Sequence, residues 1–257
     1  MIVVIAIDAL EYNLVEKFQC RNLMQTYYGK TDISEFSEPR TMVLWSSFMT
    51  GTNLEKEILA LGDQGMWNAR IDRERTFFSR FRSPEIIDLP GYSYDRSQHE
   101  SERVFLKQFF EAESRSEKDA IRDNYNKTAF EHHKNIKSAF FQALDDSHDL
   151  VIGYFSLADV IGHLNFGNTL MMKMIYRDLD DIAGGVDAPY IVLSDHGMKA
   201  VGCFGDHSGY GFWSTPFCDL GEPRITDFSQ IIMNISCDSD TVRQPFSTII
   251  KTGCDEK

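Results

Sequence analysis

Three short apolar runs along the chain end in, or just before, polar side chains that can bind a metal or act in catalysis. These runs cover residues 2–7, 150–156 and 190–194. A short apolar run bounded by turn residues is typical of a buried strand in a parallel sheet. Asp8 follows the first run, and Asp195 and His196 follow the third. Because α/β proteins bind ligands where such strands end, we expect these side chains at one edge of a sheet.

Segments with helical spacing of apolar residues lie between these runs. They cover residues 11–18, 117–145 and 169–183. Residues 41–50 are interpreted as a strand-to-helix transition that stops at Gly51. Strands alternating with helices over short connections indicate right-handed crossovers. We therefore predict an α/β fold: a mostly parallel sheet with helices on both faces, in a single domain over residues 1–257.

Other segments are less regular. Residues 22–40 are mixed, and residues 230–234 look like a strand before a polar tail whose last residues we expect to fray. Residues 62–102 are interpreted as an irregular excursion over the site face, either a lid or a plain surface loop. His132 and His133 form a tandem pair on the polar helical segment, so we expect them to be solvated.

Composition and charge exclude several classes of protein. The formal net charge of -13 disfavours coating of nucleic acid and fits an ordinary hydrophilic surface. No stretch approaches the roughly 18 apolar residues of a membrane span, and the N-terminal run fits a strand better than a signal peptide. The five cysteines show no CxxC spacing, which favours a reducing, cytoplasmic setting, with Cys203 as a small buried residue.

Carboxylates and imidazoles at metal-binding spacing extend the set at the strand ends. Asp159 and His163 are four residues apart and would face the same way on a helix. His207 lies in a glycine-flanked loop. With Asp8, Asp195 and His196 they make six candidate ligands, which suggests two ions, with zinc favoured and manganese or iron as alternatives. Taken singly, Asp8 could be a helix cap and His207 a hydrogen-bonded structural residue.

Thr41 is the candidate nucleophile. It precedes a helix, so its hydroxyl and nearby backbone N–H groups could face an anionic phosphoryl oxygen. The alternative is that Thr41 only caps the helix. Ser46 and Ser47 compete for the role, but their spacing inside the helix points them elsewhere.

Several of these stretches together resemble the alkaline phosphatase superfamily, in particular its type I phosphodiesterase/nucleotide pyrophosphatase branch. In order along the chain they cover residues 8–10, 39–51, 159–163, 194–197 and 205–207. The resemblance implies an alkaline-phosphatase-like core with a two-zinc site. Asp159, His163 and His207 would then hold one ion, and Asp8, Asp195 and His196 the other. Thr41 would attack phosphorus and give a phospho-threonine intermediate.

The function expected on this basis is hydrolysis of a small phosphate ester, as a phosphodiesterase or nucleotide pyrophosphatase. A phosphomonoesterase or phosphonate hydrolase on the same two-metal site is one alternative, although only Arg40 offers a basic group next to Thr41. A sulfatase would need a cysteine or serine in place of Thr41, and a phosphosugar mutase would need a second domain. A non-catalytic metal-binding protein would have no use for the hydroxyl. The oligomeric state is not predicted.

Overall fold

The central element of the protein is a six-stranded sheet. The computed structural model describes residues 1–238 of the chain. The strands lie in the order β2-β8-β5-β1-β4-β3. Strand β8 runs antiparallel to both of its neighbours, β2 and β5, and the other pairs are parallel. Their bounds are β1 Ile2–Ile7, β2 Tyr27–Asp32, β3 Pro84–Ile87, β4 Leu150–Phe155, β5 Tyr190–Ser194 and β8 Tyr210–Thr215. The predicted α/β fold with a mostly parallel sheet is confirmed.

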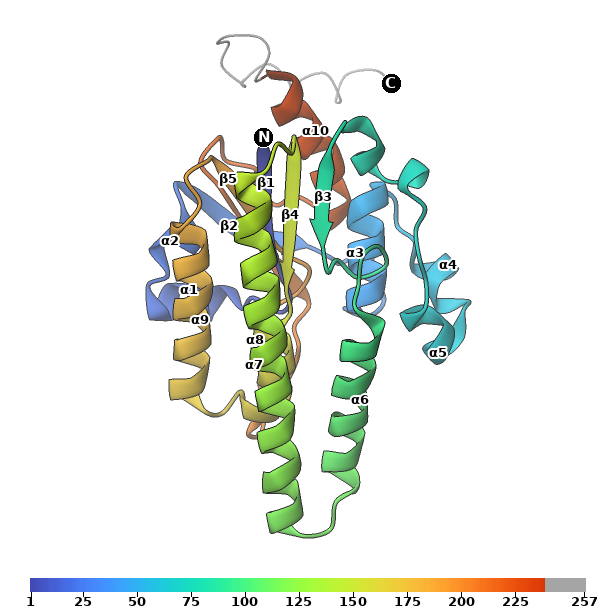
Figure 1. The fold of residues 1–257 in the computed structure, drawn as a ribbon, viewed down its shortest axis with the longest axis vertical. Coiled ribbons are helices and arrows are strands. Elements are labelled where there is room, and N and C mark those ends of the chain that lie inside the picture. The colour runs from blue at the N-terminus through green and yellow to red at the C-terminus, as the bar shows by residue number, and fades with distance from the viewer. Residues whose placement is uncertain (239–257) are drawn as a thin grey trace.

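Helices cover both faces of the sheet (Figure 1). One face packs against α1 Tyr12–Phe18, α2 Arg21–Met24, α6 Arg96–Glu111, α7 Arg115–Asp145, α8 Leu157–Asn165 and α9 Thr169–Gly184. The other face carries α3 Thr41–Thr50, α4 Glu55–Leu59, α5 Gly62–Trp67, α10 Phe228–Asp238 and the short turns η1 Arg73–Arg75, η2 Phe77–Arg80 and η3 Ile225–Asp227. A two-stranded hairpin, β6 Met198–Val201 and β7 Phe204–His207, lies apart from the main sheet.

Strand β1 shows why the apolar runs are continuous. Val3 and Ile5 pack into the cluster under α7 to α9, while Ile2 and Val4 pack into the cluster under α3. A strand buried on both faces needs an apolar residue at every position, whereas a half-exposed strand alternates. The three predicted strands are therefore the central ones, β1, β4 and β5.

The helical predictions are also confirmed, with one adjustment. Residues 11–18, 117–145 and 169–183 fall on α1, α7 and α9. Residues 41–50 are entirely helical, with no strand at their start, and Gly51 ends α3 in a left-handed conformation. The Ser114 hydroxyl caps α7 by accepting a hydrogen bond from the N–H of Glu117.

Three segments differ from their prediction. Residues 22–40 contain β2, whose polar sequence pairs with β8 from far along the chain. Residues 62–102 are not irregular throughout, because they hold α5, an edge strand of the main sheet (β3) and the start of α6; a lid role stays a prediction. Residues 230–234 are part of helix α10, on which Phe228 and Ile232, four residues apart, are both fully buried. The expected fraying of the tail concerns residues outside those described.

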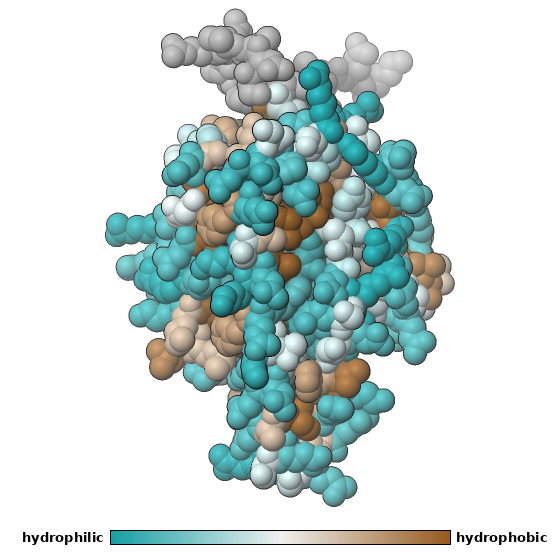
Figure 2. Space-filling model, in the orientation of Figure 1, coloured by the Kyte–Doolittle hydropathy of each residue, from teal (hydrophilic) through white to brown (hydrophobic). Residues whose placement is uncertain are grey.

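The long hairpin of α6 and α7 extends past the edge where the parallel strands end (Figure 1). Hydrophilic residues dominate the face of the molecule seen in Figure 2, with smaller apolar patches between them. Within residues 1–238, none of the helices combines the length and apolar character needed to cross a membrane.

Candidate active site

The ends of β1 and β5 bring Asp8, Asp195 and His196 together. The two strands are neighbours, with Ala6 beside Leu193, so the residues that follow them share one edge of the sheet. The Ser194 hydroxyl fixes this edge: it accepts from the N–H of Leu10 at 3.0 Å and donates to the carbonyl of His196 at 2.6 Å. His196 Nε2 lies 3.3 Å from Asp8 Oδ1 and 3.4 Å from Asp195 Oδ2.

A second group forms beside the first. Asp159 and His163 lie one turn apart on α8, and Asp159 Oδ2 is 3.2 Å from His163 Nε2. Asp159 Oδ1 is 3.2 Å from His207 Nε2. His207 is the last residue of β7 and not part of a free loop, so the β6–β7 hairpin carries it to α8. In each group the ligand atoms lie within 4.8 Å of one another.

The imidazole rings of the two groups lie close together, and each ring directs the same nitrogen, Nε2, at the carboxylates. The rings of His196 and His207 stack with centroids 3.9 Å apart. The Nδ1 atoms of His163, His196 and His207 each lie 2.8–3.4 Å from a backbone carbonyl oxygen, those of Gly205, Gly197 and Pro39 respectively. Such outer contacts fix a histidine with its other nitrogen free to bind a metal. All three present Nε2 to the carboxylates.

Thr41 lies at the same place. It is the first residue of α3, with Arg40 as the N-cap, and its side chain is buried. Its Oγ1 is 3.4 Å from His196 Nε2. Ser47 turns away and donates to the carbonyl of Val43 in its own helix. The hydroxyl of Thr41 therefore lies where the start of α3 meets the two groups of candidate ligands. The sequence had placed Thr41 just before the helix, whereas it is the first helical residue.

The donor atoms of both groups fit divalent cations. Within residues 1–238, several of these buried atoms have no hydrogen-bond partner, although most lie 3.2–3.4 Å from an opposite group: Asp8 Oδ1, Asp159 Oδ1, both carboxylate oxygens of Asp195, and His207 Nε2. Leaving buried polar atoms unpaired costs on the order of 1–3 kcal/mol each, and more where they are charged. A cation bound between carboxylates and imidazoles would offset that cost, and this mixed donor set suits zinc or manganese.

Without a cation, the pKa values of Asp8 and Asp195 are raised, whereas His163 and His207 outweigh the effect of burial and hold the pKa of Asp159 well below its ordinary value. Burial, and next the charge of Asp159, raise the pKa of Asp8 to about 7. Burial, with Asp8 adding to it, raises the pKa of Asp195 well above its ordinary value. Burial lowers the pKa of His196 to about 3, so this imidazole is neutral, which is the form that binds metals. A cation would have to displace protons from the two aspartates.

Other parts of the sequence were interpreted incorrectly. His132 and His133 are buried and not solvated, because α7 packs both against the body of the protein. His133 Nε2 contacts Asp178 at 2.7 Å, and His132 contacts Asp88, a residue that was not singled out. The position of Asp88 directly after the apolar pair at the end of β3 was the available signal. Cys203 is exposed instead of buried.

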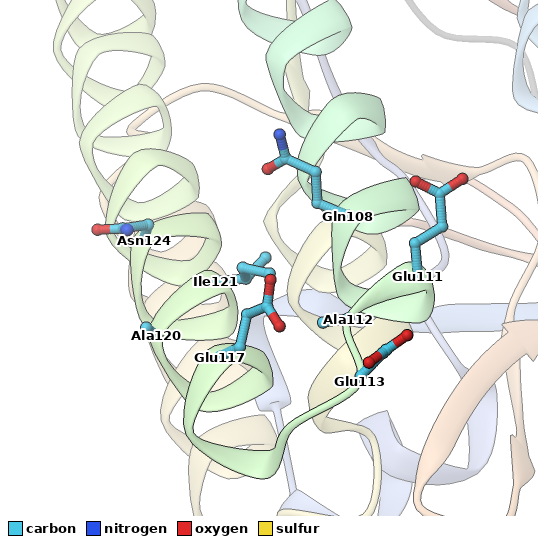
Figure 3. A pocket seen from close by; sticks show the side chains of 8 residues that line it. All are labelled: Gln108, Glu111, Ala112, Glu113, Glu117, Ala120, Ile121 and Asn124. Carbon is cyan, nitrogen blue, oxygen red and sulfur yellow. The ribbon is translucent and has the colours of Figure 1, made fainter.

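Two hollows lie outside these ligand groups. One, of about 600 Å³, lies between the end of α6 and the start of α7 and is lined by carboxylates including Glu111, Glu113 and Glu117 (Figure 3). The other, of about 500 Å³, is lined by Asp63 and Trp67 among others. Asp63 lies 3.5 Å from Arg40, which also pairs with Glu38 at 2.7 Å. The guanidinium next to Thr41 is thus engaged by two acidic side chains.

The comparisons with known proteins give structural matches only. No family model matches the chain, and no curated protein matches it in sequence. The structure is similar to that of murine ectonucleotide pyrophosphatase/phosphodiesterase 5, with 12% identity and a TM-score of 0.44, over 78% of this chain and 58% of that one. An inactive mutant of the murine protein in complex with AMP matches equally. The chain thus spans less than two thirds of the murine protein's length.

A TAB5 alkaline phosphatase mutant with magnesium bound in its M3 site is also similar. The identity is 13% and the TM-score 0.49, over 92% of this chain and 97% of that one. Because one fold hosts many reactions, the function has to be derived from the site.

Proposed function

We propose that the protein is a metal-dependent hydrolase of phosphate esters, most consistent with a phosphodiesterase or nucleotide pyrophosphatase. Two divalent cations, with zinc favoured over manganese, would be held by the two ligand groups around Asp159 and Asp195. The observation that carries the proposal is the position of Thr41 Oγ1, 3.4 Å from His196 Nε2, where the groups meet. A purely structural metal site is closed by its ligands and needs no hydroxyl beside it.

Thr41 would act as the nucleophile in a two-step reaction. Its Oγ1 forms a bond to phosphorus while the bond from phosphorus to the leaving oxygen breaks, and the hydroxyl proton passes to solvent. Water then attacks phosphorus, releases the phosphoryl group and returns a proton to Thr41. When bound, the cations would favour the ionised hydroxyl and neutralise charge on the phosphoryl oxygens. Thr41 begins α3, so the N–H groups of that helix's first turn add positive potential at the same place.

The surroundings of Thr41 favour a diester over a monoester. A monoester carries one more negative charge, so its recognition benefits from an additional cationic side chain. Arg40 is adjacent in sequence, but its guanidinium pairs with Glu38 and Asp63. A diester or a phosphoanhydride, with less charge on the attacked phosphorus, is the better match.

Hydrolysis of bis-p-nitrophenyl phosphate against p-nitrophenyl phosphate tests the proposal, using metal-stripped protein with zinc or manganese added back. We expect metal to restore activity with a preference for the diester. Thr41→Ala should lower turnover at least about a thousandfold, as loss of a nucleophile does, while its metal content stays at the wild-type value.

Thr50→Ala is the matched control. Thr50 ends the same helix and donates only to backbone carbonyls, so its loss should leave turnover near wild type. Preference for the monoester would reassign the protein as a phosphomonoesterase. Full activity of Thr41→Ala would remove the nucleophile, and metal binding without activity on any phosphate ester would indicate a binding protein.

A further inference from the structure

A third convergence of ligand atoms lies outside the two groups around Thr41. Asp88 directly follows β3, His99 lies on α6, and His132 lies on α7. One ligand atom from each of the three lies within 4.8 Å of the others. All three side chains are buried, with 9% exposure or less. Asp88 is 11 residues from His99 and 44 residues from His132 along the chain, so three separate elements meet at one point.

The two imidazoles face the same carboxylate oxygen. Asp88 Oδ2 lies 2.7 Å from His132 Nε2 and 3.3 Å from His99 Nε2. The other oxygen, Oδ1, accepts the N–H of Asp95 at 2.7 Å, which fixes the direction of the carboxylate. In tetrahedral zinc sites with bonds of about 2.0–2.1 Å, ligand atoms are roughly 3.3 Å apart. The His99 contact already has this spacing, and His132 would withdraw by roughly half an ångström.

Glu102 completes the arrangement around His99. Its Oε2 lies 2.7 Å from His99 Nδ1, and its side chain is buried. Metal-binding histidines typically donate their second N–H to a carboxylate or carbonyl, which fixes the ring and makes the ligand nitrogen more basic. His99 thus has the carboxylate of Glu102 at Nδ1 and the carboxylate of Asp88 at Nε2. This arrangement is typical of a histidine that binds a metal through Nε2.

The charge of the cluster also has to be balanced. Asp88 and Glu102 are two carboxylates in a buried region, and buried charges require a partner. Protons on both imidazoles would balance them, and so would one divalent cation between two neutral imidazoles. The two states can be told apart by counting bound metal ions, because only the second state contains one.

We propose that Asp88, His99 and His132 form a third divalent cation site, with zinc as the favoured ion and water as its fourth ligand. The choice of zinc follows from the ligand set, two imidazoles and one carboxylate. The site would tie the end of β3 to α6 and α7. It does not depend on the proposed function, since none of its residues belongs to the two groups at Thr41.

Aromatic rings connect this third site with Asp8. The Tyr94 ring stacks on His99 with centroids 3.7 Å apart and meets the edge of the Tyr154 ring at 6.4 Å. The Tyr154 hydroxyl donates a hydrogen bond to Asp8 Oδ2. A cation that fixes His99 would therefore also restrict Tyr94 and Tyr154, and Tyr154 is the hydrogen-bond donor to Asp8.

The test is the number of metal ions per chain. The full-length protein is stripped, reconstituted with zinc, freed of loose metal and measured by elemental analysis. We expect three ions per wild-type chain and two in His132→Gln. His133→Gln is the matched control, because His133 is also buried, is next in sequence and pairs with Asp178 at 2.7 Å outside the cluster. It should keep three ions.

The same number of ions in the wild type and in His132→Gln would overturn the proposal and assign the cluster to hydrogen bonds between Asp88 and the two imidazoles, whatever number of ions the two groups at Thr41 hold. Glu102→Gln adds a second measurement: it keeps all three ligands, so one of the three ions should bind about 10–100-fold more weakly. Unchanged affinity of all three ions there would also contradict the site. Since the count does not use turnover, failure of the proposed reaction would not affect it.

Discussion

At the scale of single residues, Asp195 is the side chain whose state depends most on a cation. It is fully buried, and within the described part of the chain neither of its carboxylate oxygens has a hydrogen-bond partner. A group in this position is stable only as a neutral acid or beside a positive charge. An aspartate at this position is therefore best explained as a metal ligand.

We predict that Asp195→Asn binds one ion per chain fewer than the wild type, because an amide is a much weaker ligand than a carboxylate. Elemental analysis after reconstitution gives the count. Asp206→Asn is the control, since Asp206 is exposed, pairs with Lys199, and accepts the N–H of His207 through an oxygen that asparagine keeps. An unchanged count in Asp195→Asn would contradict the ligand assignment.

The raised pKa of Asp8, about 7, predicts a pH dependence of metal binding. A cation can bind each carboxylate only after its proton has left, so affinity should increase as pH rises through 7. Each proton displaced by the ion lowers affinity about tenfold per pH unit below the pKa of its group, and the raised pKa of Asp195 adds a second such proton. Competition with a chromophoric chelator between pH 6 and 8 measures this, and equal affinities at both ends would contradict it.

At the scale of elements, the site depends on how closely the β6–β7 hairpin approaches α8. A Cβ on Gly205 of β7 would clash with Met198 Sδ and lie 2.7 Å from the carbonyl oxygen of Gly162 on α8, and a Cβ on Gly162 would also meet Met198. The carbonyl of Gly205 is also the outer partner of His163 Nδ1. The glycines that flank the ligands therefore set the distance between His163 and His207.

Gly205→Ala should push the hairpin away from α8 and weaken the ion held by Asp159, His163 and His207. Since it disturbs an outer contact of a ligand, we expect a loss of affinity on the order of tenfold or more. Gly209→Ala is the matched control, because nothing lies within 4 Å of a Cβ there. Zinc titration of both variants gives the comparison, and similar affinities would show that the hairpin can give way without cost.

At the scale of the whole molecule, bound cations would join segments from the entire chain. Asp8 comes from the N-terminal strand, Thr41 from α3, Asp159 from α8 and His207 from β7. Three carboxylates crowded at one edge of the sheet repel one another until a cation lies between them. Metal binding should therefore contribute directly to the stability of the fold.

We predict that a chelator lowers the melting temperature of the wild type. An ion present at 100 times its Kd stabilises by about 2.7 kcal/mol, which corresponds to roughly 5–10 °C for a domain of this size. Thr41→Ala should show the same shift, because Thr41 is not counted among the ligands. Calorimetry measures both, and a melting temperature that ignores complete metal removal would contradict a stabilising role.

Strands β1 and β2 show which parts of the fold the local sequence pattern can predict and which it cannot. The continuous apolar run of β1 predicted its position because a strand covered on both faces is apolar at every residue. The polar strand β2 was missed, since its stability comes from pairing with β8, about 180 residues away in the chain. Likewise residues 230–234 looked like a strand, while burial of Phe228 and Ile232 on one side makes them helical.

By itself, the sequence determined the central strands and the main helices and pointed to six candidate ligands with Thr41, because apolar runs and the spacing of carboxylates and imidazoles are local properties. Only the tertiary structure decided which of these side chains lie together, because the order of strands in the sheet depends on contacts between distant segments. The meeting of Asp88 with His99 and His132 is of this second kind. It exists because the hairpin of α6 and α7 folds back on the end of β3, and no local pattern encodes that contact.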